Sequence, residues 1–124
     1  MPRPTILLVD AHEDSRFIYA AMLAHHGYRV VELECGEGTL EQVLALRPQL
    51  TVLTLSAPAD PAWEMLQALR QHPEAGATPV VAVSTTGMAE DRERALALGC
   101  VAFLVKPLPP MELLVAARRV IGAA

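Results

Sequence analysis

Short apolar runs alternate with longer stretches of mixed polar and apolar residues along this chain. Five runs are typical of strands buried on both faces of a parallel sheet, because they are short, continuous and rich in β-branched residues. They comprise residues 5–9, 29–33, 50–55, 79–83 and 101–105. Each is followed by a stretch with helical spacing of its apolar residues, so the pattern predicts five β-then-α units.

The stretches between the strands begin and end at residues that commonly bound helices. We expect helices from 13 to 26, from the region of Leu40 to before Pro48, from Asp60 as an N-cap with Pro61 at the first helical position, from 88 to 98, and from Pro109 and Pro110 onward. The expected apolar inner positions are Ile18, Ala21, Met22 and His25, then Leu40, Val43 and Leu44, then Met65, Leu66 and Leu69, and finally Leu113, Ala117, Val120 and Ile121. Gly27 and Gly99 supply two of the helix ends.

Alternating units with short connections favour a parallel sheet covered by helices on both faces. With right-handed crossovers this is a doubly wound α/β fold, whose functional site lies at the carboxyl ends of the strands beside the switch in strand order. The segments that would meet there are residues 10–14, 54–58, 84–87 and 106–107. A length of 124 residues is that of one ordinary domain, so residues 1–124 are expected to form a single domain.

Composition and charge exclude several classes of function. The hydrophobic fraction is 52%, but it is divided among short segments and no run of about 20 apolar residues would span a membrane. No secretory pattern follows the N-terminus, which predicts a cytoplasmic protein. A net charge of −4 disfavours direct nucleic-acid binding. Cys35 and Cys100 lack metal-ligand spacing and are expected to be reduced thiols.

Several short motifs occur in an order and spacing that resemble the receiver domain of response regulators over essentially the whole chain. They are an apolar strand ending at Asp10 with Asp14 and Arg16 behind it, Gly27-Tyr28, Arg47-Pro48, Pro58, Ser84, Gly99 and Lys106-Pro107. The resemblance implies a CheY-like (βα)5 three-layer sandwich with strand order 2-1-3-4-5. It also implies a non-enzymatic signalling module of a two-component system, in which a histidine kinase's phosphoryl group moves to an aspartate that ends the third strand. Two acidic residues would hold magnesium, and a Ser/Thr and a Lys would report the phosphoryl group.

Matched position by position, this phosphoryl site is incomplete. Asp10 matches the first acidic residue, but Ala11 stands where the second is expected and Thr54 stands at the phosphoacceptor position. The remaining positions match: Ser84 is the hydroxyl switch residue, Phe103 the aromatic switch residue, Lys106 the lysine and Pro107 the proline of an expected cis peptide bond. No Asp or Glu lies between Glu41 and Asp60, so a shift in register supplies no acceptor.

The two missing carboxylates change the expected chemistry. An aspartate is an anion at neutral pH and attacks phosphorus directly, whereas Thr54 is a neutral alcohol that would need a base and would form a stable ester. Magnesium prefers oxygen ligands that include one or two carboxylates, so its binding is expected to be weak or absent, with Asp10 and Glu13 as weak candidate ligands. We instead predict that Asp10 and Lys106 contact and balance each other. Asp14 is expected in the first turn of the first helix, where acidic residues are favourable.

Two other interpretations remain open at this point. A receiver could still be phosphorylated at a non-standard acidic residue, such as Asp14 or Asp60. Alternatively, Asp10-Ala11-His12 followed by Ser15 weakly resembles the Asp-x-His-x-x-Gly motif of cobalamin-binding domains, which share the alternating architecture. The glycine of that motif is replaced by Ser15, which leaves an isolated histidine.

The favoured hypothesis is a degenerate receiver, or pseudo-receiver, that acts as a phosphorylation-independent protein-interaction module. By resemblance, its docking surface would involve the fourth helix, the fifth strand and the fifth helix. The residues expected there are Met88, Glu90, Arg94, Phe103 and Arg118. The partner would be a histidine kinase, an output domain, another regulator or a second copy of the chain. Trp63 is expected to pack at the start of the third helix.

Overall fold

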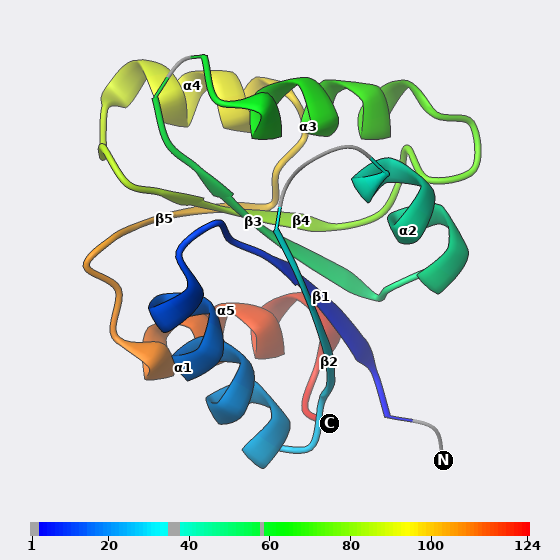
Figure 1. Cartoon of the computed structure of the whole chain (residues 1–124), viewed down its shortest axis with the longest axis vertical. Coiled ribbons are helices and arrows are strands. Elements are labelled where there is room, and N and C mark those ends of the chain that lie inside the picture. The colour runs from blue at the N-terminus through cyan, green and yellow to red at the C-terminus, as the bar shows by residue number, and fades with distance from the viewer. Residues whose placement is uncertain (1–2, 35–37, 58) are drawn as a thin grey trace.

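The computed structural model of the chain describes residues 3–34, 38–57 and 59–124. Strands and helices alternate along it, as the sequence pattern predicts (Figure 1). In chain order they are β1 (Thr5–Val9), α1 (Glu13–His25), β2 (Arg29–Leu33), α2 (Thr39–Leu46), β3 (Leu50–Leu55), α3 (Pro61–Gln71), β4 (Val80–Ser84), α4 (Ala89–Ala97), β5 (Ala102–Val105) and α5 (Pro110–Ile121). Pro58 of the expected motif and Cys35 lie outside the described residues.

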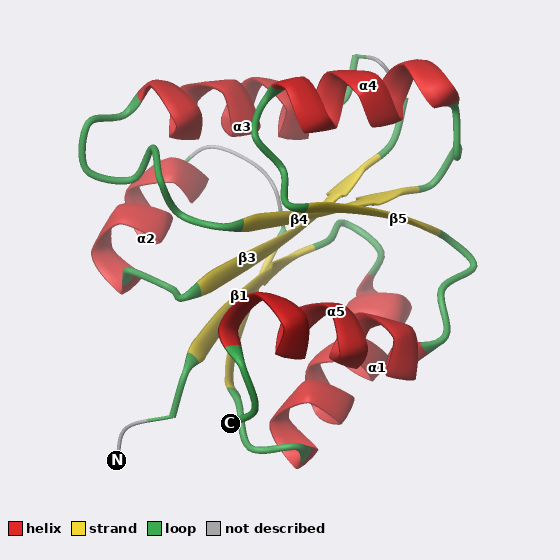
Figure 2. Ribbon diagram, turned by 180° about the vertical axis from the view of Figure 1, so that it is seen from behind, coloured by secondary structure: helices red, strands yellow, loops and turns green. Residues whose placement is uncertain are grey.

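The five strands form one parallel sheet in the order β2-β1-β3-β4-β5. Helices α1 and α5 cover one face of the sheet, and α2, α3 and α4 cover the other (Figure 1, Figure 2). The predicted doubly wound fold and strand order are therefore confirmed. None of the helices in the described part of the chain is long and apolar enough to cross a membrane.

The alternation of side chains along each strand divides the core into two apolar clusters. In β1, Leu7 and Val9 pack with α2, α3 and α4, whereas Ile6 and Leu8 pack with α1 and α5. The other central strands divide in the same way, and β1, β3 and β4 are buried along their whole length. This double burial explains why these strands appear in the sequence as continuous apolar runs instead of alternating patterns.

The prediction of which α1 residues face the core is wrong. The structure buries Tyr19, Ala20 and Leu23, while Ile18 is 53% exposed. Of the other expected positions, Met22 is half-buried and Ala21 and His25 are exposed. The physical reason is that α1 carries apolar residues around its whole circumference, so spacing alone does not select a face. Packing against α5 selects it, and the Tyr19 hydroxyl donates a hydrogen bond to the Leu108 carbonyl at 3.0 Å.

The predicted start of α3 is confirmed. Asp60 is the N-cap, and its Oδ1 accepts a hydrogen bond from the Ala62 N–H at 2.9 Å. Its Oδ2 accepts from the Ser56 N–H, also at 2.9 Å, so the cap also holds the residue that follows β3. Pro61 occupies the first helical position, where its missing N–H leaves no intrahelical bond unmade.

The Arg70 guanidinium connects the end of α3 to the loops that precede β4 and β5. Its Nε donates to the Leu98 carbonyl at 2.7 Å, and Nη2 donates to the Gly99 carbonyl at 3.2 Å. Nη1 donates to the carbonyls of Gly76 at 3.0 Å and Thr78 at 2.6 Å. Gly99 has a φ of +83°, and a Cβ there would lie 3.1 Å from the Arg70 Nε, so both its backbone and its neighbour favour glycine.

Candidate functional site

The register of the sheet gathers the expected site residues at its carboxyl edge. Val9 of β1 pairs with Leu53 of β3, so Asp10, directly after β1, and Thr54, in β3, are the next residues along these two adjacent segments. Ser84 closes β4 opposite Val105, and Lys106 follows directly. The expected group is therefore brought to one edge, next to the central strand pair at which the chain switches direction across the sheet.

The Asp10 carboxylate is fully buried and receives donors from several directions. Its Oδ2 lies 2.8 Å from the Lys106 Nζ and 3.2 Å from the Ser15 Oγ. Its Oδ1 accepts a hydrogen bond from the His12 backbone N–H at 2.9 Å, and the His12 Nδ1 lies 3.4 Å away. The predicted contact between Asp10 and Lys106 is confirmed, and it is direct.

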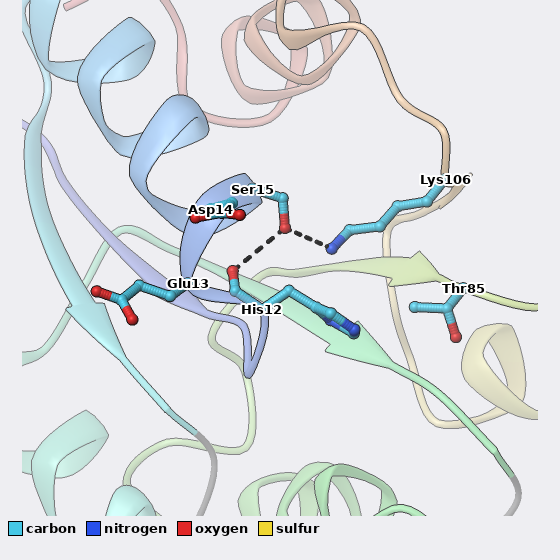
Figure 3. Close-up of a pocket in the computed structure, with 6 residues that line it drawn as sticks. All are labelled: His12, Glu13, Asp14, Ser15, Thr85 and Lys106. Carbon is cyan, nitrogen blue, oxygen red and sulfur yellow. Dashed lines mark hydrogen bonds between the residues drawn. The ribbon is translucent and has the colours of Figure 1, made fainter.

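Ser15, in the first turn of α1, completes a triangle with Asp10 and Lys106. The Lys106 Nζ donates to the Ser15 Oγ at 2.9 Å as well as to Asp10. Figure 3 shows the Ser15 hydroxyl between the Lys106 ammonium and the His12 carbonyl, which lies 3.3 Å from it. Because Ser15 donates through one hydrogen and accepts through its lone pairs, it links the start of α1 to the loop after β5.

Burial and hydrogen bonding act on the pKa of Asp10 in opposite directions. Burial is the largest single influence and by itself raises the pKa. The hydrogen bonds from Lys106, His12 and Ser15, together with the Lys106 charge, outweigh it, so the pKa of Asp10 lies below its ordinary value. Burial also raises the pKa of Tyr19, and the Asp10 charge adds to this shift. Asp10 is therefore an ion-paired anion at neutral pH.

A pocket of about 660 Å³ opens beside this triangle. It is lined by His12, Glu13, Asp14, Ser15, Thr85 and Lys106. Glu13 is exposed and its carboxylate points away from Lys106, and Asp14 lies in the first turn of α1 as expected (Figure 3). Thr54 is buried at this edge of the sheet, with 7% of its surface exposed. Ala11 is exposed, and its side chain has no oxygen that could bind a metal ion.

Ser84 is buried, and its hydroxyl is engaged in the loop between β4 and α4. The Oγ accepts hydrogen bonds from the backbone N–H groups of Thr86 at 3.1 Å and Gly87 at 2.9 Å. The Thr86 hydroxyl in turn donates to the buried Asp91 carboxylate at 2.6 Å. In β4, Ala82 faces α2, α3 and α4, and Ser84 continues that alternation, so Thr85 lines the pocket in its place. The switch role of Ser84 stays a prediction.

The residues expected on an interaction surface lie in different surroundings. Met88 and Glu90 are exposed at the start of α4, and Phe103 is half-buried against the cluster beneath α3. The Arg94 guanidinium lies over the buried Trp63 ring, 4.2 Å from its centroid. The Arg118 Nη2 lies 3.4 Å from the His26 Nδ1 and therefore on the flank of α5 that faces α1.

An apolar groove lies between β5 and α5. It has a volume of about 470 Å³, and the apolar side chains of Val101, Met111 and Val115 at its rim are each about half exposed. Glu112 and Arg119 also line it. The groove uses a different side of α5 from Arg118, so the apolar part of the expected docking surface includes residues that sequence reasoning did not name.

Sequence reasoning also missed three contacts of Asp10. They are the Ser15 hydroxyl, the His12 N–H, and Arg16, whose Nη1 donates to the Asp10 carbonyl at 2.6 Å. The Arg16 Nε also lies 3.4 Å from the Glu32 carboxylate on β2. All three donors fall within six residues after Asp10, a clustering that could have suggested a local network at the start of α1. The predicted cis peptide bond between Lys106 and Pro107 is present.

Comparison with known proteins supports the same family. A protein of Cyanophora paradoxa named probable transcriptional regulator ycf27 is 32% identical over 87% of this chain. The match covers 44% of that protein. The chain thus spans about half the length of some curated relatives that it matches. The structure of the chemotaxis protein CheY4 of Vibrio cholerae superposes with a TM-score of 0.86 at 25% identity, covering 97% of this chain and all of that one.

A further structure shares the fold. The receiver domain of the sensor histidine kinase PA1611 of Pseudomonas aeruginosa, solved with magnesium coordinated in its active-site cleft, superposes with a TM-score of 0.84 at 24% identity, and the match covers 98% of this chain and 100% of that one. The sequence model of the family described as the response regulator receiver domain matches residues 6–118 of this chain. This assignment sets aside the cobalamin-binding alternative. The chain belongs to the receiver domains of response regulators, the signalling modules of two-component systems.

Proposed function

We propose that this chain is a pseudo-receiver, which signals through protein contacts and does not form an aspartyl phosphate. The observation that carries the proposal is Thr54 at the carboxyl end of β3, beside Asp10. An alcohol at this place attacks phosphorus only after losing its proton, and the ester that it forms is not labile as an acyl phosphate is. The reversible reaction of the family therefore has no acceptor in β3.

Asp10 is a poor base for activating Thr54. Its carboxylate is already bonded to Lys106, Ser15 and the His12 N–H, and these bonds hold its pKa below the ordinary value. A weak base that is ion-paired does not readily accept a proton from a hydroxyl at neutral pH. The lysine that would neutralise a phosphoryl group is instead paired with this carboxylate.

Magnesium, which the family implies, does not fit the residues at this edge. It requires near-octahedral oxygen coordination and usually takes one or two carboxylates in addition to phosphate oxygens. Here Ala11 supplies no ligand, and both Asp10 oxygens accept hydrogen bonds. Across residues 3–34, 38–57 and 59–124, no group of three or more His, Cys, Asp or Glu is arranged so that it could hold a metal ion.

The proposed activity is binding and not catalysis. The groove between β5 and α5 offers a half-exposed apolar rim, and Met88 and Glu90 are exposed at the start of α4. An apolar area with charged residues at its margin suits a protein partner. The partner would be a histidine kinase, an output domain, another regulator or a second copy, and its contacts would be made without a phosphoryl signal.

The proposal is tested by offering the chain a phosphoryl group. Incubation with acetyl phosphate and magnesium, read by intact mass, is expected to add no phosphoryl group. Titration with magnesium and beryllofluoride is expected to leave Trp63 fluorescence unchanged. A hydroxylamine-sensitive phosphoryl adduct would contradict the proposal, and peptide mapping would then locate it. Asp14 is an exposed candidate for such an adduct, whereas both Asp60 oxygens already accept backbone hydrogen bonds.

Restoring the missing carboxylates provides the positive control. The double variant Ala11→Asp/Thr54→Asp recreates the three-carboxylate arrangement around Lys106 that the family uses. It is expected to gain magnesium binding and phosphorylation by acetyl phosphate. Thr54→Ser, which keeps a hydroxyl, is the matched control and is expected to behave like the parent chain.

A further inference from the structure

A second pocket lies at the amino edge of the sheet, opposite the edge that holds Asp10. One wall is the end of α2 with the turn into β3, and the other is the loop from Glu74 to Thr78 before β4 (Figure 1). We call it the amino-edge pocket. Its volume of about 410 Å³ is within the range of small-molecule sites, roughly 300–1,000 Å³. The proposed function does not use it.

The floor of the amino-edge pocket is apolar and its loop wall is held in place. Val43 and Ala75 are buried members of the core cluster, and Pro48 between the walls is also buried. The Thr78 carbonyl accepts a hydrogen bond from the Arg70 Nη1 at 2.6 Å, and the Thr78 N–H donates to the Ala75 carbonyl at 3.1 Å. A ligand therefore meets a largely preformed surface.

Two opposite charges line this pocket without pairing. Arg47 and Glu74 both contribute to its walls, and both are exposed. Within the described part of the chain, neither the Arg47 guanidinium nor the Glu74 carboxylate takes part in a hydrogen bond or an ion pair. A positive and a negative group are thus both available to a ligand that enters between them.

The backbone at Arg47 is unfavourable for the residue that occupies it. Among the described residues, Arg47 is the one non-glycine with a positive φ, at +48°, and it ends α2 where glycine is preferred. Pro48 further disfavours a helical conformation of the residue before it. A positive charge at the end of a helix is favourable, but that role does not require a guanidinium. Strain of this kind persists most often at functional sites.

We infer that the amino-edge pocket binds a small zwitterion with an apolar side chain, of which a free apolar α-amino acid is the simplest example. The ligand carboxylate pairs with the Arg47 guanidinium, whose planar fork matches it, and the ligand ammonium pairs with Glu74. The apolar side chain lies on the floor formed by Val43 and Ala75. A simple anion would be repelled by Glu74 and a simple cation by Arg47, so only a zwitterion satisfies both charges.

This inference goes beyond the proposed function and does not depend on it. A ligand here would give the chain a chemical input that needs no phosphoryl group. The probes are L-leucine and L-phenylalanine, each titrated to about 10 mM and detected by saturation-transfer NMR. At least one is expected to bind saturably, with amide shifts in labelled protein confined to residues 43–48 and 74–78.

Analogues of leucine test each part of the ligand. 4-Methylpentanoate lacks the ammonium and 3-methylbutylamine lacks the carboxylate, and each is expected to bind at least about tenfold more weakly than leucine. Glycine keeps both charges but has no side chain to cover the apolar floor, and it is expected to bind at least about tenfold more weakly as well.

Variants of the two charged residues test the site itself. Arg47→Met and Glu74→Gln are each expected to weaken binding at least about tenfold, whereas Arg47→Lys keeps the helix-end charge and part of the affinity. Arg92→Met and Glu93→Gln, exposed on α4, are the matched controls and are expected to bind like the parent chain. Arg47→Gly is expected to lose binding without a lower melting temperature, because glycine accepts the positive φ.

Several outcomes would overturn the inference. The site is refuted if neither amino acid binds the parent chain, or if binding survives in both Arg47→Met and Glu74→Gln. Equal affinities for leucine and 4-methylpentanoate would refute the zwitterion as the ligand class. An Arg47→Gly variant that melts well below the parent chain would show that Arg47 is retained for folding. None of these outcomes changes the proposed function, which is decided by acetyl phosphate.

Discussion

At the scale of single residues, the buried Asp10 carboxylate shows how one missing neighbour changes the role of another. Because residue 11 is alanine, no second carboxylate lies next to Asp10 in the sequence. Lys106 can therefore balance the charge of Asp10, and Ser15 donates a hydrogen bond to the same carboxylate oxygen. In a pocket with three carboxylates, one lysine could not balance the charge. The same lysine therefore serves as an internal counter-ion here.

The ionisation of Asp10 predicts a specific loss of stability in acid. Its pKa in the folded chain lies below the ordinary value of 3.8, so its charge stabilises the folded state fully above that value. This contribution is lost as the pH falls from 3.8 through the lower, folded pKa. Asp10→Asn is expected to reduce the free energy of unfolding by about 2–3 kcal/mol at neutral pH, because it leaves Lys106 without its counter-charge.

Urea denaturation across a pH series checks this prediction. The difference between the parent chain and Asp10→Asn should shrink below pH 3.8, as Asp10 in the parent chain becomes protonated. Asp14→Asn is the matched control, since Asp14 is an exposed acidic residue nearby, in the first turn of α1, and it should change the free energy of unfolding little. A constant difference from neutral to acidic pH would contradict the assigned linkage.

The sequence identified Asp10, Thr54 and Lys106 as neighbours because the alternating pattern brings the carboxyl ends of parallel strands to one edge, and because the resemblance to receiver domains implies the strand order. It did not identify Ser15 as a partner of Asp10, and it did not single out Thr85 within the segment 84–87, because their positions depend on how two loops turn after their strands. It placed Ser84 in the pocket group, whereas side-chain alternation in β4 directs its hydroxyl to the next loop. The positions of site residues were thus predictable where the sheet determines them, and not where the conformation of a loop does.

At the scale of elements, α3 and α4 are held together by two arginines that act differently. Arg94 on α4 lies over the Trp63 ring on α3, a cation–π contact between the two helices. Arg70 donates to four carbonyls, two before β4 and two before β5. The positions of both loops therefore depend on one guanidinium.

Arg70→Met is expected to lower the free energy of unfolding by about 2–3 kcal/mol, because several carbonyls lose a charged donor while the side-chain stem is kept. Urea denaturation measures the effect. Arg92→Met, on the exposed side of α4, is the control and is expected to change the free energy of unfolding by less than about 0.5 kcal/mol. Equal effects of the two substitutions would show that the carbonyl contacts contribute nothing.

Element boundaries were predicted to within one or two residues, since prolines, glycines and the Asp60 cap mark them. The face of α1 was not, because Ile18 and Tyr19 are both apolar enough to be buried and are adjacent in sequence. Tyr19 is the one whose hydroxyl reaches the Leu108 carbonyl. A helix with apolar residues on all sides needs its tertiary partner to define its inner face.

At the scale of the whole molecule, the sheet separates two apolar layers. Leu69 belongs to the layer beneath α2, α3 and α4, and Ile6 to the layer against α1 and α5. Leu69→Ala is expected to lower the free energy of unfolding by about 2–5 kcal/mol and Ile6→Val by about 0.5–1.5 kcal/mol. The double variant should show the sum to within about 0.5 kcal/mol, because the two sites share no packing partners.

Thermodynamic cycles from urea denaturation test this independence. A coupling energy well above about 0.5 kcal/mol would mean that the sheet transmits packing changes from one layer to the other. The doubly wound architecture was predictable from length, alternation and turn residues, and the strand order from the resemblance to receiver domains. The distribution of exposed apolar groups was not, because the groove beside Val115 depends on where α5, which contacts α1 and β3, lies relative to β5.

Thr54, near the carboxyl end of β3, also has a consequence in time. An aspartyl phosphate gives an ordinary receiver a built-in clock, because its hydrolysis ends the signal after a characteristic interval. Under the proposed function, Thr54 removes that clock. The duration of any signal is then set by how much of the protein the cell maintains and by how slowly its partner dissociates, so control passes from a chemical half-life to synthesis, degradation and mass action.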